Sequence, residues 1–277
     1  RIVADMVGRS LDQQFPARTR VPEPGGAAPL LAVAKLARTG VFGPLSFELR
    51  RGEILGFAGL MGAGRTETAR ALFGADSGFS GTITLHGRVV SIASPRDAIA
   101  HGIAYLSEDR KGQGLAVRMP VAANITLSDV AGVAGRLGLI DFVREAAVAR
   151  QYIESLAIKT PGPGQIVRNL SGGNQQKIAI AKWLYRQSRI MIFDEPTRGI
   201  DVGAKFAIYQ LLDRLAAEGI GVILISSELP EIMGMSDRVA VFHDGRIAGI
   251  VDTQCSTQEQ IMHLASGSDQ PPHTRYG

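Results

Sequence analysis

A short apolar segment that runs directly into a glycine-rich turn restricts the fold of this chain more than any other feature. Ile54–Ala58 has the character of a buried strand, Gly59–Thr66 (GLMGAGRT) follows it without a gap, and a helix is predicted at about 66–73. Glycines in such a turn let backbone N–H groups converge on phosphate oxygens, and the helix adds the positive end of its dipole. The pattern predicts a phosphate-binding loop, although a tight strand-to-helix turn without a ligand has similar glycine spacing.

Two positions of this loop bear directly on its chemistry. Thr66 stands where a hydroxyl would ligate Mg²⁺. Arg65 stands where the phosphate-loop pattern has Lys, and its planar guanidinium is wider than a compact ammonium, so it need not reach the same point between the last two phosphates. The nucleotide-binding residues expected here are Gly59, Gly62, Ala63, Gly64, Arg65, Thr66 and Glu67.

A second buried-strand candidate ends in two acids. Ile190–Phe193 is wholly apolar, and Asp194 and Glu195 follow it about 130 residues after the glycine-rich loop. A carboxylate at such a strand end serves the Mg²⁺ that accompanies a nucleotide, and Glu195 would then orient or deprotonate water. Strands also end in acids simply because they reach the surface, but the spacing from the loop, with a helical segment between, favours the Mg²⁺ interpretation.

The remaining pattern predicts an α/β protein with a mostly parallel sheet. A helix at about 202–217 separates the acid-ended strand from another apolar strand at 222–225, which implies a right-handed crossover. Segments of strand character between residues 30 and 92 predict an N-terminal antiparallel β subdomain. Alanine-rich patterning at about 116–163 predicts an inserted α-helical subdomain, and residues 239–251 predict a closing hairpin around Asp244-Gly245.

The two ends of the chain differ in composition from this pattern. Residues 16–29 hold four prolines and two adjacent glycines, which favour an extended connector. The helix-forming stretch Val3–Leu11 has nothing nearby to pack against. With Arg1 as the first residue, we interpret 1–29 as the tail of a preceding domain and a linker, 30–265 as the nucleotide-binding domain, and 266–277 as a disordered tail.

Composition restricts the function classes. The 30 Lys and Arg residues exceed the 26 Asp and Glu residues by only four and are scattered, which is typical of a solvated surface rather than a nucleic-acid groove. No apolar run approaches the roughly 18 residues that a membrane span requires, so work at a membrane would need a partner. The single Cys255 excludes an internal disulfide and suits a reducing compartment.

Leu170–Lys177 (LSGGNQQK) is the most specific motif in the chain. Ser171 can cap the helix that follows, and glycines with a serine hydroxyl at the mouth of a helix also form an anion-binding surface. The motif lies about 20 residues before the acid-ended strand. With it, nearly the whole chain after residue 30 resembles the ATP-binding cassette superfamily.

In that superfamily, the phosphate loop of one cassette faces the Leu-Ser-Gly-Gly motif of another across a shared nucleotide. The resemblance implies ATP and Mg²⁺ as cofactors, an inter-cassette position for Asp201, and a catalytic role for Glu195. Glu108 falls where the family has a glutamine that senses Mg²⁺ and contacts the membrane partner, and Ser227 falls at the switch histidine. The implied Mg²⁺ residues are Thr66, Asp194 and Glu108, and those directed to the partner's ATP are Ser171, Gly172, Gly173 and Gln175.

The runs SEDRK (107–111), DEPTRGIDVG (194–203) and SSELPE (226–231) resemble the second cassette of monosaccharide importers for ribose, galactose or xylose. The implied partners are a first cassette in the same polypeptide, membrane permease subunits and, indirectly, an external sugar-binding protein, with no nucleic acid. The implied location is the cytoplasmic face of the bacterial inner membrane.

Three departures from the family consensus, at Arg65, Glu108 and Ser227, predict that the chain's own phosphate-loop site is degenerate. It would bind ATP and turn it over slowly, while the intact Leu-Ser-Gly-Gly motif completes the partner's site. One alternative is a non-catalytic regulatory cassette. Another is a soluble cassette ATPase acting on ribosomes or DNA, against which the scattered basic residues argue.

Overall fold

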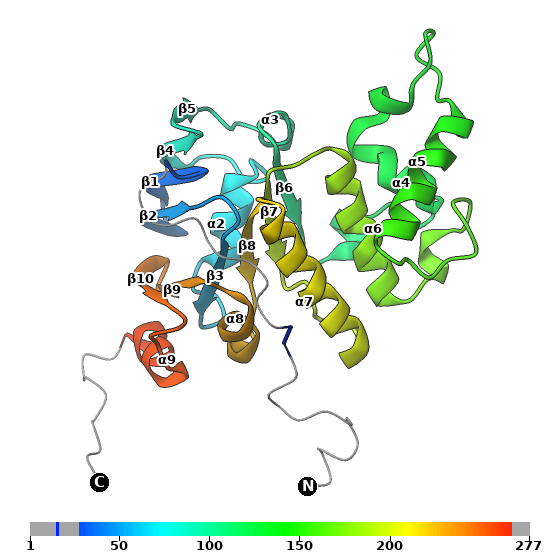
Figure 1. Cartoon of the computed structure of the whole chain (residues 1–277). Coiled ribbons are helices and arrows are strands. Elements are labelled where there is room, and N and C mark those ends of the chain that lie inside the picture. Colours follow the sequence, from blue (N-terminus) through cyan, green and yellow to red (C-terminus); the bar gives the residue numbers. More distant parts are fainter. Residues whose placement is uncertain (1–14, 17–27, 268–277) are drawn as a thin grey trace, which may run out of the picture.

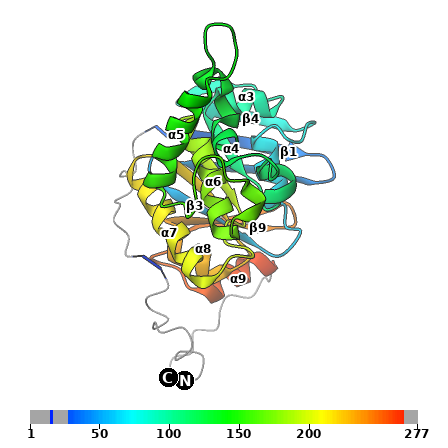
Figure 2. The same ribbon diagram turned by 90° about the vertical axis from the view of Figure 1, so that its right-hand side faces the viewer.

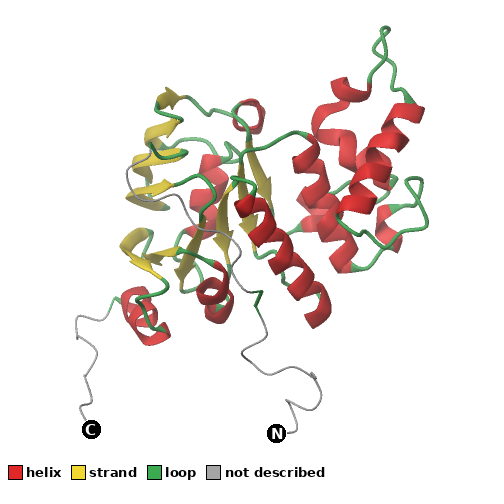
Figure 3. Ribbon diagram, in the orientation of Figure 1, coloured by secondary structure: helices red, strands yellow, loops and turns green. Residues whose placement is uncertain are grey.

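The computed structural model describes residues 15–16 and 28–267. The predicted helix at Val3–Leu11, most of the predicted linker, and the tail from residue 268 lie outside the described residues. Within the described part, two sheets and a group of helices lie side by side (Figure 1, Figure 3). None of the described helices has the length and apolar character that a bilayer-spanning segment requires.

The strands are β1 (Leu31–Arg38), β2 (Phe42–Leu49), β3 (Ile54–Gly59), β4 (Ser80–Leu85), β5 (Arg88–Val90), β6 (Ile103–Leu106), β7 (Ile190–Asp194), β8 (Gly221–Ile225), β9 (Arg238–His243) and β10 (Arg246–Asp252). The α-helices are α2 (Arg65–Leu72), α3 (Pro95–Ala100), α4 (Val121–Thr126), α5 (Phe142–Ser155), α6 (Gly172–Tyr185), α7 (Val202–Ala217), α8 (Leu229–Met235) and α9 (Gln258–Ser266). Shorter helical turns are η2 (Arg110–Gly114), η3 (Leu127–Val133) and η4 (Val167–Asn169).

A six-stranded sheet forms the centre of the molecule, in the order β10-β9-β3-β8-β7-β6. All neighbouring strands in it are parallel except the β10–β9 hairpin at one edge. Every residue of β7 and β8 is buried, which explains why their sequences are continuous apolar runs rather than alternating ones. The predicted α/β class, with a mostly parallel sheet, is confirmed.

The second sheet is antiparallel, in the order β2-β1-β4-β5, and corresponds to the predicted N-terminal β subdomain. Three aromatic rings join it to the central sheet. Phe47 on β2 meets the edge of Phe57 on β3 with ring centroids 5.3 Å apart, and Phe57 lies 4.8 Å from Phe242 on β9. All three rings are fully or almost fully buried, so one hydrophobic core is shared by both sheets.

A group of helices projects from the central sheet on the side away from the antiparallel sheet (Figure 1, Figure 2). The helical segment predicted at about 116–163 corresponds to α4 and α5, and α6 packs against α4 and extends the same group toward β6. Trp183 of α6 contacts the ring of Phe73, just after α2, with centroids 5.8 Å apart. Phe73 in turn lies 5.6 Å from Tyr105 of β6. These rings connect the helical group to the helix that follows the glycine-rich loop.

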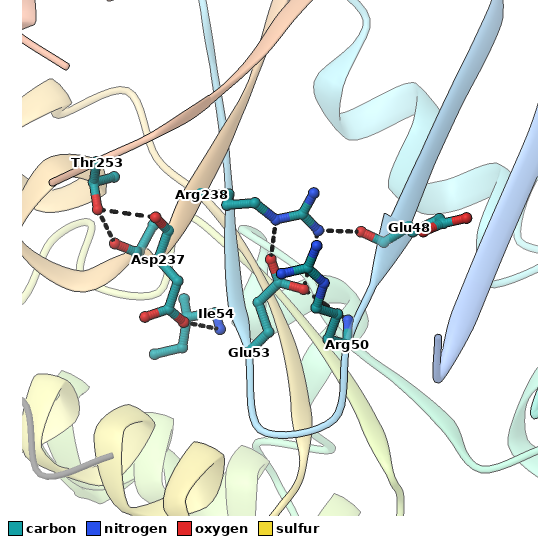
Figure 4. A network of polar contacts seen from close by, with 8 residues as sticks. Glu48, Arg50, Glu53, Ile54, Asp237, Arg238 and Thr253 are labelled. Atoms are coloured by element: carbon teal, nitrogen blue, oxygen red, sulfur yellow. Dashed lines mark hydrogen bonds and ion pairs between the residues drawn. The ribbon is translucent and has the colours of Figure 1, made fainter. Parts of the chain in front are cut away.

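A buried ion pair holds the beginnings of β3 and β9 together (Figure 4). Glu53, directly before β3, is 1% exposed and accepts hydrogen bonds from the Arg238 guanidinium at 2.6 and 3.2 Å. The same guanidinium donates to the carbonyl of Glu48 on β2 at 2.9 Å. Asp237 accepts a hydrogen bond from the Ile54 N–H at 2.8 Å. The network therefore fixes the strand that leads into the glycine-rich loop.

We expect Glu53→Ala to destabilise the protein strongly, because it leaves the mostly buried Arg238 guanidinium without a charge partner. Removing one member of a buried pair costs about 3 kcal/mol, which lowers the unfolding midpoint by roughly 6–12 °C. Asp129→Ala is the control, since it breaks the half-exposed pair with Arg186 and should cost at most about 1 kcal/mol. Equal losses of unfolding free energy for the two variants, measured by urea and thermal unfolding, would contradict the structural role of Glu53.

Candidate functional site

An open pocket of about 450 Å³ lies where β3 and β8 end. The glycine-rich loop forms one wall of it. Another wall carries Glu195 and the pair Ser226–Ser227. We call Ser226–Ser227 the switch loop. Further lining residues are Glu108, Arg198, and three residues of α9, Ile261, Met262 and Ala265. Three predicted regions that lie far apart in the sequence therefore meet at this pocket.

The glycine-rich loop has the backbone geometry that its sequence predicts. Gly62 and Gly64 adopt left-handed φ values of 79° and 97°, which favour glycine. A Cβ on Gly59 would lie 2.6 Å from the Phe242 carbonyl oxygen, whereas a Cβ on Gly62 would meet nothing within 4 Å. The first backbone hydrogen bond of α2 runs from the Thr68 N–H to the Gly64 carbonyl, so earlier amides of the turn are not used inside the helix. The loop is thus shaped to accept an anion.

Arg65 lies inside the pocket and is held there. Its Nη1 donates a hydrogen bond of 2.7 Å to the carbonyl of Ser226 in the switch loop. Burial lowers the pKa of Arg65, and the carboxylates of Glu195 and Asp194 oppose this effect. The guanidinium stays charged in any case, so it supplies positive charge between the switch loop and the two acids.

Asp194 is buried at the end of β7 and accepts two hydrogen bonds. The Thr66 hydroxyl donates to its Oδ1 at 3.2 Å, and the Tyr105 hydroxyl donates to its Oδ2 at 2.7 Å. Burial raises the pKa of Asp194, and these two hydrogen bonds oppose the rise. A hydroxyl beside a carboxylate is a donor set that fits Mg²⁺. No group of three His, Cys, Asp or Glu side chains in the described part could hold a metal, so phosphate and water would supply the other ligands.

Glu195 faces the pocket from a left-handed backbone position, with φ of 50°. The Ser227 hydroxyl donates a hydrogen bond of 3.1 Å to its Oε2. Burial raises the pKa of Glu195 and so brings it closer to the pKa of a useful general base. Ser227 is paired with Glu195, but a neutral hydroxyl cannot carry the positive charge that a protonated imidazole would supply.

Glu108 also lines the pocket, but its partner is not a metal ligand. Arg198 Nη1 forms an ion pair with Glu108 Oε1, and both side chains are largely exposed, at 66% and 44%. The ion pair therefore places Glu108 beside Arg198. Its implied Mg²⁺ role remains a prediction.

The residues of the Leu-Ser-Gly-Gly motif do not line this pocket. Ser171 occupies the N-cap position of α6 as predicted, but its hydroxyl accepts a hydrogen bond from the Asn174 amide at 2.8 Å rather than from the helix backbone. A Cβ on Gly173 would lie 2.8 Å from the Ala204 Cβ, so the glycine allows α6 to pack closely on α7. We call Leu170–Gly173 the signature turn.

Gln175 is 4% exposed, and its amide donates to the carbonyls of Val167 and Leu170 at 3.2 and 3.1 Å. In this geometry its side chain supports the signature turn from within, and it does not face a surface where a partner's nucleotide would lie. The ligand role that the resemblance implies for Gln175 toward a partner's ATP remains a prediction. Asp201 lies nearby and caps α7 by accepting a hydrogen bond from the Ala204 N–H at 2.9 Å.

Arg110 connects the signature turn to the pocket wall, a role that no sequence pattern indicated. Its Nη1 donates to the Gly172 carbonyl at 3.0 Å and its Nη2 to the Arg198 carbonyl at 3.1 Å. Burial lowers the pKa of Arg110. One guanidinium fork thus joins the signature turn to the loop after Glu195.

Comparison with known proteins gives a consistent result. Residues 42–198 match the family model described as ABC transporter. A protein of Burkholderia cenocepacia strain HI2424, named as a ribose/galactose/methyl galactoside import ATP-binding protein, is 67% identical over 96% of this chain and 51% of its own length. A protein of Agrobacterium fabrum strain C58 with the same functional name is 63% identical over 96% of this chain and 52% of its own length. The chain spans about half the length of these curated relatives.

Two crystal structures share the fold. One is an ATP-binding cassette of an ABC transporter in its ADP conformation, with a TM-score of 0.70 and 18% identity over 87% of this chain and 96% of the other. The second is a nucleotide-free ATP-binding cassette from an ABC transporter, also with a TM-score of 0.70, at 19% identity over 86% of this chain and 96% of the other.

We expect Arg110→Ala to loosen the signature turn, because two backbone carbonyls lose a charged donor. A loss of about 1.5 kcal/mol would raise amide exchange of residues 168–176 about tenfold, measured by hydrogen–deuterium exchange mass spectrometry. Arg110→Lys should raise this exchange by a smaller factor, since a single ammonium keeps the charge but lacks the planar fork of the guanidinium. The control is Arg118→Ala, at an exposed position of the same segment. Unchanged exchange in Arg110→Ala would rule out this bridge.

Proposed function

Because the chain belongs to the ABC transporter family, we propose that it is a nucleotide-binding cassette that binds ATP with Mg²⁺ at the Gly59–Thr66 pocket. One observation carries this proposal. The glycine-rich loop, the acids Asp194 and Glu195, and Ser227 come from three separate parts of the sequence and meet at one edge of the sheet. Such an arrangement combines an anion-binding loop, a cation-binding oxygen pair and a potential general base.

Each group has a distinct role in the proposed reaction. Backbone N–H groups of the loop and the start of α2 would bind the phosphates. Thr66 and Asp194 would hold Mg²⁺, which would supply positive charge to neutralise the phosphates. Tyr105 would keep the Asp194 carboxylate oriented through its hydrogen bond of 2.7 Å. Glu195 would orient a water molecule or accept its proton, with Ser227 fixing the carboxylate.

We further propose that this cassette is the second of two in an ATP-binding protein that energises sugar import. The names of the relatives and their roughly doubled length support this proposal, as do the motifs at 107–111, 194–203 and 226–231. The cassette proper would span residues 30–265. Its partners would be a first cassette, membrane permease subunits and, indirectly, an external sugar-binding protein. These partners would hold it at the cytoplasmic face of the bacterial inner membrane.

We propose that the chain's own site is degenerate, with Ser171, Gly172, Gly173 and the inter-cassette residue Asp201 serving the partner's site. Three contacts support the first part. Arg65 is hydrogen-bonded to the switch loop, Glu108 is paired with Arg198, and Ser227 offers Glu195 only a neutral hydroxyl. A regulatory cassette without turnover is the second candidate, favoured by the same Arg65 contact. An unchanged transport rate for Glu195→Gln in the two-cassette protein would favour that candidate.

The isolated chain should bind Mg²⁺-ATP and hydrolyse it more slowly than about one turnover per second. Removal of Mg²⁺ with a chelator should weaken binding at least tenfold, because Thr66 and Asp194 then lose the cation between them and the phosphates. Calorimetry and a coupled ATPase assay measure the two quantities. Turnover at rates typical of working ATPases would refute the degenerate site, and unaltered affinity without Mg²⁺ would refute the assignment of Thr66 and Asp194.

The combined variant Arg65→Lys, Glu108→Gln and Ser227→His should raise turnover at least tenfold, and only when two cassettes can pair. The physical reason is threefold. Lys at residue 65 removes the guanidinium that binds the switch loop, and Gln at residue 108 cannot form the ion pair with Arg198. His at residue 227 adds a titratable partner for Glu195. The control adds Glu195→Gln to the same variant and should abolish the gain. A gain in turnover that survives Glu195→Gln would come from another site and would contradict the proposal that these three residues make the chain's own site degenerate.

A further inference from the structure

An aromatic ring from the segment that precedes the cassette packs between α7 and α8, at a position that we call the groove. The ring of Phe15 lies against Tyr209 of α7, with centroids 5.2 Å apart and planes tilted by 41°. In Figure 1, residues 15–16 form the short dark-blue piece of chain beside α8, near the lower end of α7. Phe15 packs on the hydrophobic core, although it lies sixteen residues before the first strand begins at Leu31.

The floor of this groove is Gly234, near the end of α8. A Cβ at this position would lie 2.5 Å from two ring carbons of Phe15, closer than real Cβ contacts allow. Glycine is a poor residue for a helix, since alanine is more favourable at most helical positions. The glycine is therefore explained by the ring that it accommodates, and its cost to the helix is offset by that contact.

The groove is connected to the pocket by polar contacts. Burial raises the pKa of the Tyr209 hydroxyl, and the nearby carboxylate of Glu231 adds to this effect. Glu231 is 1% exposed and accepts hydrogen bonds from Thr197, at 3.0 Å, and from the hydroxyl of Ser226. Ser226 belongs to the switch loop, and its carbonyl accepts the hydrogen bond of Arg65. Because Gly234 and Glu231 belong to the same helix, α8, contacts run from Phe15 through this helix to the wall of the pocket.

We propose that the groove between α7 and α8 is the docking site of the segment that precedes the cassette, with Phe15 as its anchor, and that the docked ring supports the switch loop. The occupant is this chain's own segment, because Phe15 fills the groove and Gly234 leaves room for it. The ring of Phe15 is therefore linked to the switch loop through α8, whose Glu231 accepts the hydrogen bond of the Ser226 hydroxyl. This inference goes beyond the proposed function and does not require nucleotide.

The decisive experiment is a double-mutant cycle on the full 277-residue chain, with thermal unfolding as the readout. With Phe15 present, Gly234→Ala should lower the unfolding midpoint by several degrees, because the added methyl expels the ring. In the Phe15→Ala background, Gly234→Ala should leave the midpoint unchanged or raise it by about 2 °C, because alanine is then only a better helix former. The same destabilisation in both backgrounds would overturn the anchor.

Hydrogen–deuterium exchange tests the link to the pocket in the same proteins without nucleotide. Phe15→Ala should increase amide exchange of residues 226–235 at least threefold. The matched control is Phe142→Ala, which removes a ring that is 74% exposed on the helical group and should leave this exchange unchanged. Unaltered exchange of 226–235 in Phe15→Ala would overturn the proposed support of the switch loop. Neither result depends on whether the pocket binds ATP, so failure here is distinct from failure of the proposed function.

Discussion

The parallel pairing of β8 with both β3 and β7 is the constraint on which the site depends. Phe57 of β3 and Asp194 of β7 both lie opposite Ile225 of β8. The glycine-rich loop, the two acids and the switch loop therefore leave the sheet at the same level. A slip of one residue in the β7–β8 pairing would turn Asp194 toward the opposite face of the sheet and separate it from Thr66. The buried aliphatic faces of β7 and β8 make such a slip costly.

This convergence creates an electrostatic problem that the neighbouring side chains resolve. Burial raises the pKa values of both Asp194 and Glu195, so two carboxylates close together are unfavourable on their own. Tyr105 and Thr66 donate hydrogen bonds to Asp194, Ser227 donates one to Glu195, and Arg65 adds a positive charge between them. A lysine at residue 65 would carry the same charge without the planar fork that binds the Ser226 carbonyl. The substitution therefore alters both the charge distribution and the freedom of the switch loop.

Sequence patterns predicted those parts of the site that rest on local signals. The β3–loop–α2 unit, β7, α7, β8 and the closing hairpin each combine a hydrophobic period with a clear turn or cap, and all are confirmed. The short helices α3, α8 and α9 were not predicted because they are too short to show a period. Tyr105 and Arg110 were missed since their partners are 62 to 89 residues away. The role of Gln175 toward a partner's ATP stays a prediction, and within this chain its buried amide supports the signature turn.

The contacts of Arg198 would give the proposed degenerate site a physical reason to persist. Its side chain pairs with Glu108 at the pocket, and its carbonyl accepts a hydrogen bond from Arg110, which also holds the Gly172 carbonyl. Anything that displaces the Glu108–Arg198 pair therefore acts on the signature turn through two hydrogen bonds. If, as proposed, that turn completes the site of a partner cassette, then a ligand that displaces the Glu108–Arg198 pair would act on the partner's site without any hydrolysis. The proposed slow turnover would suit this role, because a nucleotide that stays bound would hold the signature turn in one geometry through many cycles of the partner.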